Sequence, residues 1–431
     1  MAHRSVRVAL GVGGALLLAA SATACSSSSS TPSTASSTPA GSASATSSAS
    51  AASSASATSA SSSTAAASGT CGSIPNVGFT DKSGLVSSLG SFADSYNGLN
   101  GTVYKSPWST WKGATSNVKV GILIDGLTNP FQTELENNLV SGLKALGYAT
   151  VALAPSSASV TDQLQGYQTL LNDNVNLIIA QVQDPTAYNS LIDKAAKSGI
   201  PTVGVLNEIA DANAVNVVPN SVLGGMKLAQ YVVQQAQGKG QFMFIHGIVG
   251  APIDTDTMNG ANDVLKLCSG ITTNESIQTQ FQASVAKQQV LSYLNTHPQA
   301  VTGVITAGPF TSGVIQAFQQ AGRTVPVITN NGLDEGGLAY WVQNKATYNG
   351  VALANTPNGL AYATVQVAHK MLEGDGVKLN TLSIDPPLVT NDDLSKYVTL
   401  DPSWTINSAG TASGPANLYV SNDFIDAIFT K

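Results

Sequence analysis

The chain has 431 residues and a formal net charge of −6, and only 10% of its residues are charged. Proteins that bind nucleic acid normally present a basic face, and the part of this chain expected to fold has no cluster of lysine or arginine. Composition therefore argues against a nucleic-acid partner. About 360 residues follow a low-complexity N-terminal region, which is enough for two domains of ordinary size.

The N-terminal region is typical of an exported protein. Basic residues at His3, Arg4 and Arg7 precede an apolar stretch over residues 8–20, which is too short to span a bilayer. Small residues then lead directly to Cys25, which predicts cleavage by a lipoprotein signal peptidase and lipidation of Cys25. Ordinary secretory cleavage beside a coincidental cysteine is the alternative.

A spacer follows the predicted lipidation site. Residues 26–68 are almost entirely serine, alanine and threonine, a composition that buries too little apolar surface to offset the loss of chain entropy on folding. Such a segment would hold a folded head away from a membrane surface.

Two cysteines remain, Cys71 and Cys268. An exported protein matures in an oxidising compartment, so we expect them to form a disulfide. Two free buried thiols are the alternative, because a sequence does not show whether two Cα atoms lie within the limit of about 7 Å.

Beyond an irregular segment over residues 72–117, apolar β-rich stretches alternate with amphipathic helical ones, a pattern typical of a parallel sheet. A helix is expected over Pro130–Leu146, where apolar residues recur every four positions. The expected strands are nearly continuous in apolar residues, as in strands buried on both faces: Val118–Ile124, Ala149–Ala154, Leu177–Gln181, Thr202–Val205 and Val215–Val218.

The alternation restarts after Pro219 with a helix over Val222–Gln237. Four further strands are expected over Gln241–Ile245, Ile277–Phe281, Gly303–Ile305 and Val325–Thr329. Two such units in series predict an α/β fold with two lobes that face one another across a cleft. Ligands of open α/β sheets bind beyond the carboxyl ends of the strands, so residues just after these strands are the candidates for a site.

Catalytic and metal-binding motifs are absent from the sequence. We find no G-x-S-x-G elbow, Walker A loop, H-E-x-x-H or C-x-x-C. The run from Asp254 to Thr257 resembles the start of a calcium loop, but Met258 occupies the third acidic position and the bidentate glutamate is missing. His246, far from the other histidines, is expected to have a structural or pocket-lining role. We therefore expect no enzyme activity, no metal and no cofactor.

Side-chain amides recur where the expected strands end. Amides both donate and accept hydrogen bonds, as hydroxyl groups do, so such a set matches a polyhydroxyl ligand. The alternative is that asparagine is simply common in loops. The residues are Asn129, Gln181, Asn207, Asn220, Asn330, Asn331 and Asn355.

Several short motifs follow one another along the chain: Asn129-Pro130-Phe131 after the first strand, Gly199-Ile200-Pro201, the run from Pro219 to Gly225, the segment from Gly313 to Gly322, and Asn331-Gly332. Together they resemble the ribose and galactose type of periplasmic sugar-binding protein, which serves ABC importers. The resemblance covers roughly residues 118–389.

The resemblance implies two Rossmann-like lobes with parallel sheets, joined by three hinge crossings near Pro219–Ser221, Asn355–Pro357 and Pro387–Thr390. The expected organisation is a signal peptide at 1–24, an anchor and linker at 25–70, an N-terminal extension at 71–117, lobe 1 at 118–219 and 356–387, lobe 2 at 220–355 and 388–400, and a C-terminal extension at 401–431.

Carried over by position, the family's pocket would be lined from lobe 1, the hinges and lobe 2 by Asn129, Phe131, Gln132, Asp184, Asn207, Asn220, Asn355, Thr257, Phe281, Ala307 and Asn331. Family members usually place charged side chains on the hydroxyls, where this chain has Asn207, Thr257 and Asn331. Gln132 likewise replaces a stacking aromatic residue. The identity of the ligand therefore does not follow from the resemblance.

The function implied is that of an extracytoplasmic solute-binding lipoprotein, monomeric and anchored to the cell membrane. It would bind a small neutral polar molecule, a sugar or polyol, and present it to the permease of an ABC importer. One alternative is a sensor of the same fold that signals to a membrane receptor or kinase. Another is an exported hydrolase, which the missing nucleophile and carboxylate pair disfavour. Repressors of this fold are excluded because the chain lacks a helix-turn-helix.

Overall fold

The structure is a computed structural model that describes residues 69–114, 116–126, 129–153 and 159–430. The predicted signal peptide, Cys25 and the spacer lie outside the described residues. Within the described ranges, no helix combines the length and apolar character needed to cross a membrane.

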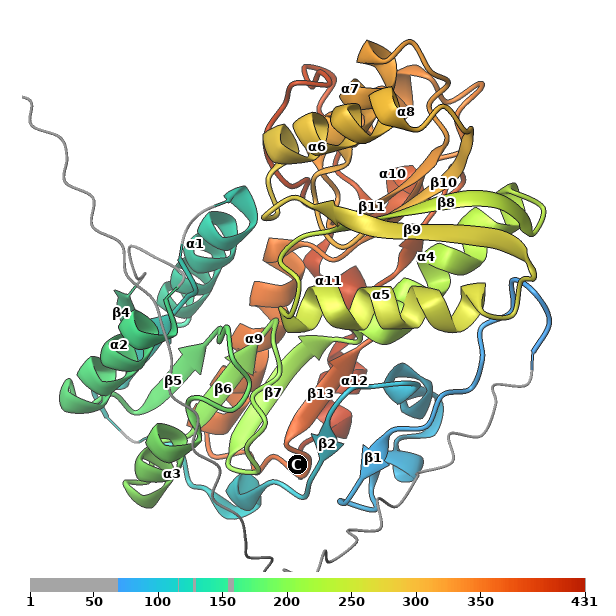
Figure 1. Cartoon of the computed structure of the whole chain (residues 1–431). Coiled ribbons are helices and arrows are strands. Elements are labelled where there is room, and N and C mark those ends of the chain that lie inside the picture. The colour runs from blue at the N-terminus through green and yellow to red at the C-terminus, as the bar shows by residue number, and fades with distance from the viewer. Residues whose placement is uncertain (1–68, 115, 127–128, 154–158, 431) are drawn as a thin grey trace, which may run out of the picture. The chain divides into compact units, whose positions relative to one another are not determined.

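Lobe 1 is built on a six-stranded sheet whose strand order is β13-β7-β6-β5-β3-β4, and every neighbouring pair is parallel (Figure 1). All residues of β5 and β6 are buried, as expected for strands covered by helices on both faces. The elements of this lobe are β3 (Lys119–Leu123), α1 (Pro130–Ala145), β4 (Ala149–Leu153), α2 (Val160–Asn172), β5 (Leu177–Ala180), α3 (Asn189–Lys197), β6 (Thr202–Val205), β7 (Ala214–Pro219), α9 (Pro357–Leu372) and β13 (Thr381–Ile384).

Lobe 2 repeats this plan with the strand order β14-β12-β11-β10-β8-β9, in which only β14 is antiparallel to its neighbour. The elements of this lobe are α4 (Ser221–Gln235), β8 (Lys239–His246), α5 (Pro252–Leu265), β9 (Gly270–Gln278), α6 (Ala283–Thr296), β10 (Val301–Thr306), α7 (Thr311–Gln320), β11 (Val327–Asn331), α8 (Glu335–Gln343), β12 (Val351–Leu353) and β14 (Leu388–Val389). The predicted fold of two α/β lobes with parallel sheets is confirmed.

One predicted strand is misplaced. The expected strand Ile277–Phe281 is the end of the longer β9, which begins at Gly270 and ends at Gln278. Gln280 and Phe281 have φ values of 54° and 55°, which end the extended conformation. The start of β9 carries polar residues because it is an edge strand, so it lacks the apolar pattern of the inner strands.

The chain passes between the two sheets three times. It crosses at Asn220 between β7 and α4, at residues 354–356 between β12 and α9, and at residues 385–387 between β13 and β14. The short strands β12, β13 and β14, which frame the last two crossings, were not predicted from the sequence.

The N-terminal extension contacts both lobes. The structure joins Cys71 and Cys268 in a disulfide, with their Cα atoms 4.5 Å apart, as the sequence predicted. Ile74 and Val77 pack on the core of lobe 2, and the residues that follow join the core of lobe 1. The extension contains β1 (Thr80–Asp81), η1 (Val86–Tyr96), β2 (Thr102–Val103) and η2 (Pro107–Thr110).

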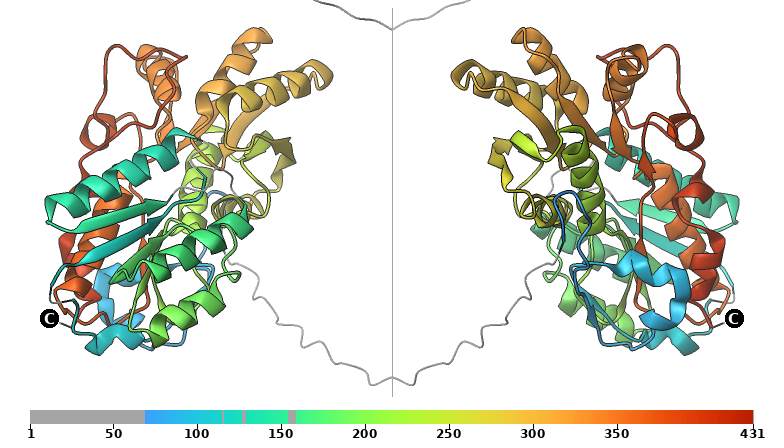
Figure 2. Two further views of the ribbon diagram at one scale, coloured as in Figure 1. Left: turned by 90° about the vertical axis from the view of Figure 1, so that its left-hand side faces the viewer. Right: turned by 90° about the vertical axis from the view of Figure 1, so that its right-hand side faces the viewer.

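The C-terminal extension also contacts both lobes. After α10 (Leu394–Tyr397), the segment that includes Ala412 packs on the core of lobe 2. The short helices α11 (Ala416–Tyr419) and α12 (Asn422–Ala427) then pack on the core of lobe 1. In Figure 2 these red helices and the blue N-terminal extension lie against lobe 1. The sequence had left the role of this extension open.

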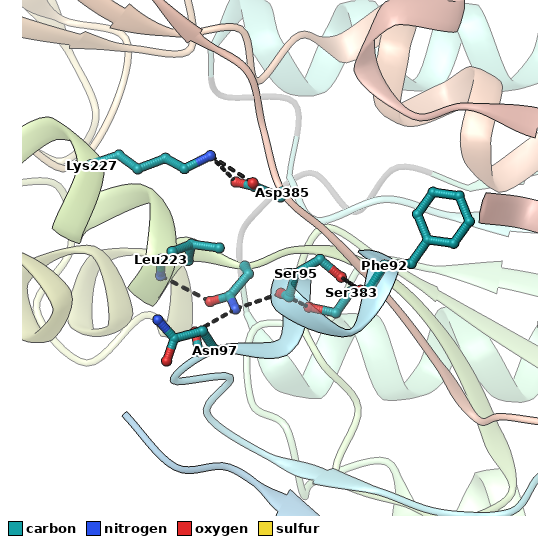
Figure 3. A network of polar contacts seen from close by, with 8 residues as sticks. Phe92, Ser95, Asn97, Leu223, Lys227, Ser383 and Asp385 are labelled. Atoms are coloured by element: carbon teal, nitrogen blue, oxygen red, sulfur yellow. Dashed lines mark hydrogen bonds and ion pairs between the residues drawn. The ribbon is translucent and has the colours of Figure 1, made fainter. Parts of the chain in front are cut away.

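A buried polar network fixes the N-terminal extension to the first crossing (Figure 3). The Asn220 side chain donates to the carbonyls of Ser95 and Asn97, at 2.8 and 2.9 Å, and accepts from the backbone N–H of Leu223 at 3.0 Å. This last bond caps the N-terminus of α4. Ser383 of β13 donates to the Ser95 carbonyl as well, at 2.8 Å.

An ion pair links α4 to the third crossing. Lys227 Nζ lies 2.6 Å from Asp385 Oδ2 (Figure 3). Both side chains are partly exposed to solvent, so the pair contributes at most about 1 kcal/mol to stability. The network around Asn220 is therefore the stronger support of the hinge.

Candidate functional site

A pocket lies between the lobes, beyond the carboxyl ends of strands from both sheets. Lobe 1 contributes Asp125, Asn129, Phe131, Gln132, Gln181, Gln183, Leu206 and Asn207. Lobe 2 and the second crossing contribute Ile248, Ala251, Ile253, Gln280, Phe281, Ala307, Gly308, Pro309, Asn331, Gly332 and Asn355. This is the place where open α/β sheets bind their ligands.

Most of the candidate residues proposed from the sequence line this pocket. They lie just beyond strand ends or at the start of α1, the helix that follows β3: Asn129, Phe131, Gln132, Asn207, Phe281, Ala307, Asn331 and Asn355. Asn129 also caps α1, because its Oδ1 accepts from the backbone N–H of Gln132 at 3.2 Å. That cap sets the start of the helix whose first turn brings Phe131 and Gln132 to the pocket wall.

Asp184 does not line this pocket. Its carboxylate accepts from the backbone and hydroxyl of Thr186, both at 2.8 Å, and from the backbone of Ala187 at 3.1 Å. These bonds lower the pKa of Asp184, with the Thr186 backbone bond making the largest contribution. Asp184 therefore stabilises a turn on lobe 1.

Asn220 and Thr257 also fall outside the pocket lining. Asn220 is fully buried and its amide is engaged by the hinge network described above. Thr257 is buried within lobe 2. A Cβ atom added to Gly225 of α4 would lie 2.0 Å from the backbone carbonyl oxygen of Thr257. Thr257 thus lies where α4 and α5 approach too closely to leave room for a ligand.

The pocket contains a carboxylate that the sequence analysis did not single out. Asp125 is only 4% exposed and follows β3. It accepts hydrogen bonds from Gln183 Nε2 and, at 3.4 Å, from Gln181 Nε2. Burial raises the pKa of Asp125, and the bond from Gln183 opposes this effect. Its position just after the first expected strand is the sequence signal that could have identified it.

The amides of the pocket have fixed orientations. Asn207 donates through Nδ2 to the carbonyl of Val182 at 2.7 Å, and Asn331 donates through Nδ2 to the carbonyl of Ala307 at 3.2 Å. Their oxygens are the atoms left to meet a ligand. Three of the described residues that line the pocket have a buried side-chain oxygen without a hydrogen-bond partner: Gln132 Oε1, Gln181 Oε1 and Asn207 Oδ1.

Asn355 has the opposite orientation. Its Oδ1 accepts from the hydroxyl of Tyr419 at 2.9 Å, so its NH2 group is the free part of the amide. Tyr419 is buried and belongs to α11 of the C-terminal extension. The tail therefore positions a side chain of the pocket.

Two aromatic rings supply apolar surface. Phe131 comes from lobe 1 and Phe281 from lobe 2, where its ring centroid lies 6.3 Å from that of Phe310. A Cβ on Gly247 would lie 2.1 Å from the Phe281 ring, so only glycine leaves room for the ring at this place. Leu206, another lining residue, has a φ of 68°, a strained value for a residue with a side chain.

The sequence pattern of the periplasmic binding protein domain matches residues 120–376. The chain belongs to this family. Its fold is that of the type I periplasmic binding proteins, and its relatives are solute-binding proteins of ABC transporters rather than enzymes. Both extensions reach beyond the matched residues.

Two curated proteins that are similar to this chain are named for the small polyhydroxyl compounds that they bind. A xylitol-binding protein from Mycolicibacterium smegmatis is 24% identical over 287 residues, covering 65% of this chain and 80% of the relative. A fructose import binding protein from Bifidobacterium longum is 23% identical over 242 residues, covering 52% of this chain and 73% of the relative.

Solved structures agree on the fold. A solute-binding protein from Bacillus halodurans with bound myo-inositol has a TM-score of 0.58 and 17% identity, covering 65% of this chain and 97% of the other. A solute-binding protein from Mycobacterium smegmatis with bound glycerol has a TM-score of 0.59 and 20% identity, covering 69% of this chain and 100% of the other. At these identities the likeness establishes the architecture alone.

Proposed function

We propose that this protein captures a small uncharged sugar or polyol outside the cytoplasm and presents it to the permease of an ABC importer. The observation that supports this most is the pocket itself, in which amides from both lobes and from a crossing surround two aromatic rings. Aromatic faces suit the C–H face of a polyol, and amides suit its hydroxyls.

The proposed mechanism is a shift of population towards a closed form. A ligand that contacts Asn207 of lobe 1 and Asn331 of lobe 2 at the same time stabilises only the arrangement in which the lobes hold it together. The permease would then distinguish the loaded receptor from the empty one.

The proposal includes attachment to the cell membrane through lipid on Cys25, and a monomeric receptor. The support for the attachment is the export signal, the cysteine after small residues and the serine- and alanine-rich spacer. Labelling cells that produce the protein with a radioactive fatty acid tests the attachment. Label in the wild type and none in Cys25→Ser is expected, and equal label in both contradicts the lipid anchor.

Thermal unfolding against a panel of xylitol, myo-inositol, D-fructose and D-allose tests ligand binding. A ligand at 100 times its dissociation constant adds about 2.7 kcal/mol to the free energy of unfolding. We expect at least one of these compounds to raise the melting temperature in a concentration-dependent way. No shift with any of them up to 50 mM, roughly the weak end of specific binding, contradicts the proposed ligand class.

Asn331→Ala tests whether the pocket is responsible. Removal of this amide should weaken binding of the panel ligand by about 1–3 kcal/mol, because ligand hydroxyls lose their partner. Asn358→Ala is the matched control, since Asn358 lies outside the pocket and donates to the carbonyl of Gly414 at 2.8 Å. Calorimetric titration of both variants measures the effect, and equal affinities remove Asn331 from the site.

A further inference from the structure

The described residues that line the pocket include one carboxylate and no basic side chain. Among the described residues that line it, Asp125 is the only one that can carry a charge at neutral pH. The hydrogen bonds to Asp125 come from the neutral amides of Gln181 and Gln183. No lysine, arginine or histidine of the described residues forms an ion pair with it. When the Asp125 carboxylate is ionised, no basic side chain of the described residues therefore forms an ion pair that compensates its charge.

The side chains on the lobe 1 side of the pocket also offer hydrogen-bond acceptors to a ligand rather than donors. The Nε2 group of Gln181 points to Asp125 and the Nδ2 group of Asn207 points to a carbonyl. Rotating either amide by 180° would place its oxygen against another oxygen, so the observed orientations are favoured. The side-chain oxygens of Gln181 and Asn207 are therefore buried without a hydrogen-bond partner, and the side-chain oxygen of Gln132 is a third such atom.

A wall of oxygens around a carboxylate matches particular ligands. Hydroxyl and ammonium groups donate hydrogen bonds to such a wall. A carboxylate or phosphate on the ligand would face Asp125 at short range in a site of low polarity, where like charges repel strongly. Buried polar atoms without partners are also costly, so a ligand that supplies donors relieves an existing cost.

We propose that Asp125 is a specificity-determining residue, which selects ligands with hydrogen-bond donors, including an amino group, and rejects anionic ones. This inference rests on the proposed function, because it concerns the same pocket. It adds that sugar acids and sugar phosphates are excluded and that amino-substituted polyols are accepted. Hydroxyl and ammonium groups both form charge-assisted hydrogen bonds with a carboxylate, but an ammonium group adds the attraction between opposite charges, so it gains about tenfold in affinity over a hydroxyl at this position.

The test uses three probes of one size that differ in charge: glycerol, serinol (2-amino-1,3-propanediol) and D-glycerate. Three-carbon probes avoid the ring stereochemistry that would otherwise decide the fit. Their dissociation constants are measured on the purified mature protein by NMR titration at up to 0.5 M, roughly the range where fragments of this size bind. We expect serinol to bind about tenfold tighter than glycerol, and D-glycerate to bind at least tenfold more weakly than glycerol.

Asp125→Asn keeps the size of the side chain and removes its charge. In this variant we expect the advantage of serinol over glycerol to disappear, and D-glycerate to gain about tenfold relative to glycerol. Asp184→Asn is the matched control, because Asp184 is a carboxylate of the same lobe that lies outside the pocket lining, and it should leave all three ratios unchanged. Circular dichroism confirms that each variant is folded.

The outcomes separate this inference from the function it rests on. D-glycerate binding as tightly as glycerol to the wild-type protein overturns the charge selection, whether or not the variant folds. Ratios that Asp125→Asn leaves unchanged overturn the role of Asp125. Either result leaves polyol binding intact. Failure of all three probes to bind overturns the polyol pocket, and the inference with it.

Discussion

The hinge offers the sharpest prediction about stability, through Asn220→Ala. The substitution removes three hydrogen bonds of a fully buried side chain: those to the carbonyls of Ser95 and Asn97, and the cap on Leu223. Loss of an N-cap costs about 1 kcal/mol. Ser95 keeps the hydroxyl of Ser383 as a donor, but the Asn97 carbonyl loses the donor described here, at a cost of about 1–3 kcal/mol. The sum is roughly 2–4 kcal/mol.

Urea unfolding followed by tryptophan fluorescence measures this loss. Ser421→Ala is the matched control, because Ser421 caps α12 through the backbone N–H of Phe424 at 3.2 Å and makes no second contact of the kind that Asn220 makes. We expect the control to lose about 1 kcal/mol. Asn220→Ser should lie between the two, since a serine can still cap α4.

The comparison of the two alanine variants is decisive. If Asn220→Ala costs no more free energy of unfolding than Ser421→Ala, the bonds to the N-terminal extension do not contribute. The extension would then be a passive cover on lobe 1, and our description of it as a support of the hinge would be wrong.

Two further predictions concern stability. Replacing Cys71 and Cys268 together by serine should lower the free energy of unfolding by roughly 2–5 kcal/mol, because the disulfide joins residues 197 positions apart; an unchanged urea midpoint contradicts this. Glu208→Gln should stabilise the protein at pH 8 by roughly 1–3 kcal/mol and have little effect at pH 4. Burial, with repulsion from Asp256, raises the pKa of Glu208 from 4.5 to about 8, so the wild type loses stability as the pH rises through this window. If Glu208→Gln raises the free energy of unfolding equally at both pH values, the raised pKa of Glu208 is refuted.

The fold was largely accessible from the sequence because its signal is local. Strands such as Leu177–Ala180 are continuous apolar runs, and the helix at Pro130–Ala145 shows a regular spacing of apolar residues. β9 was misplaced because an edge strand carries polar residues. The three-residue strand β12 and the two-residue strand β14 are too short for a periodic pattern to identify.

The site was accessible only in part, for a different reason. Asn207 and Asn331 could be found because they stand at strand ends, where the topology brings side chains together. Asp184 and Thr257 were carried over by position alone. Position does not show that the Asp184 carboxylate stabilises a turn or that the backbone at Thr257 packs closely against α4. The contact between Tyr419 and Asn355 joins residues 64 positions apart, and no local pattern encodes it.

Hydrogen exchange of the backbone amides, with and without a ligand identified by the thermal panel, tests the central claim most directly. The account predicts slower exchange on both sides of the pocket, just after β3 and β6 in lobe 1 and at residues 280–282 and 307–309 in lobe 2, with no change on the outer helices α2 and α7. Protection in one lobe alone, or protection that is confined to another part of the surface, would contradict a ligand held between the two lobes.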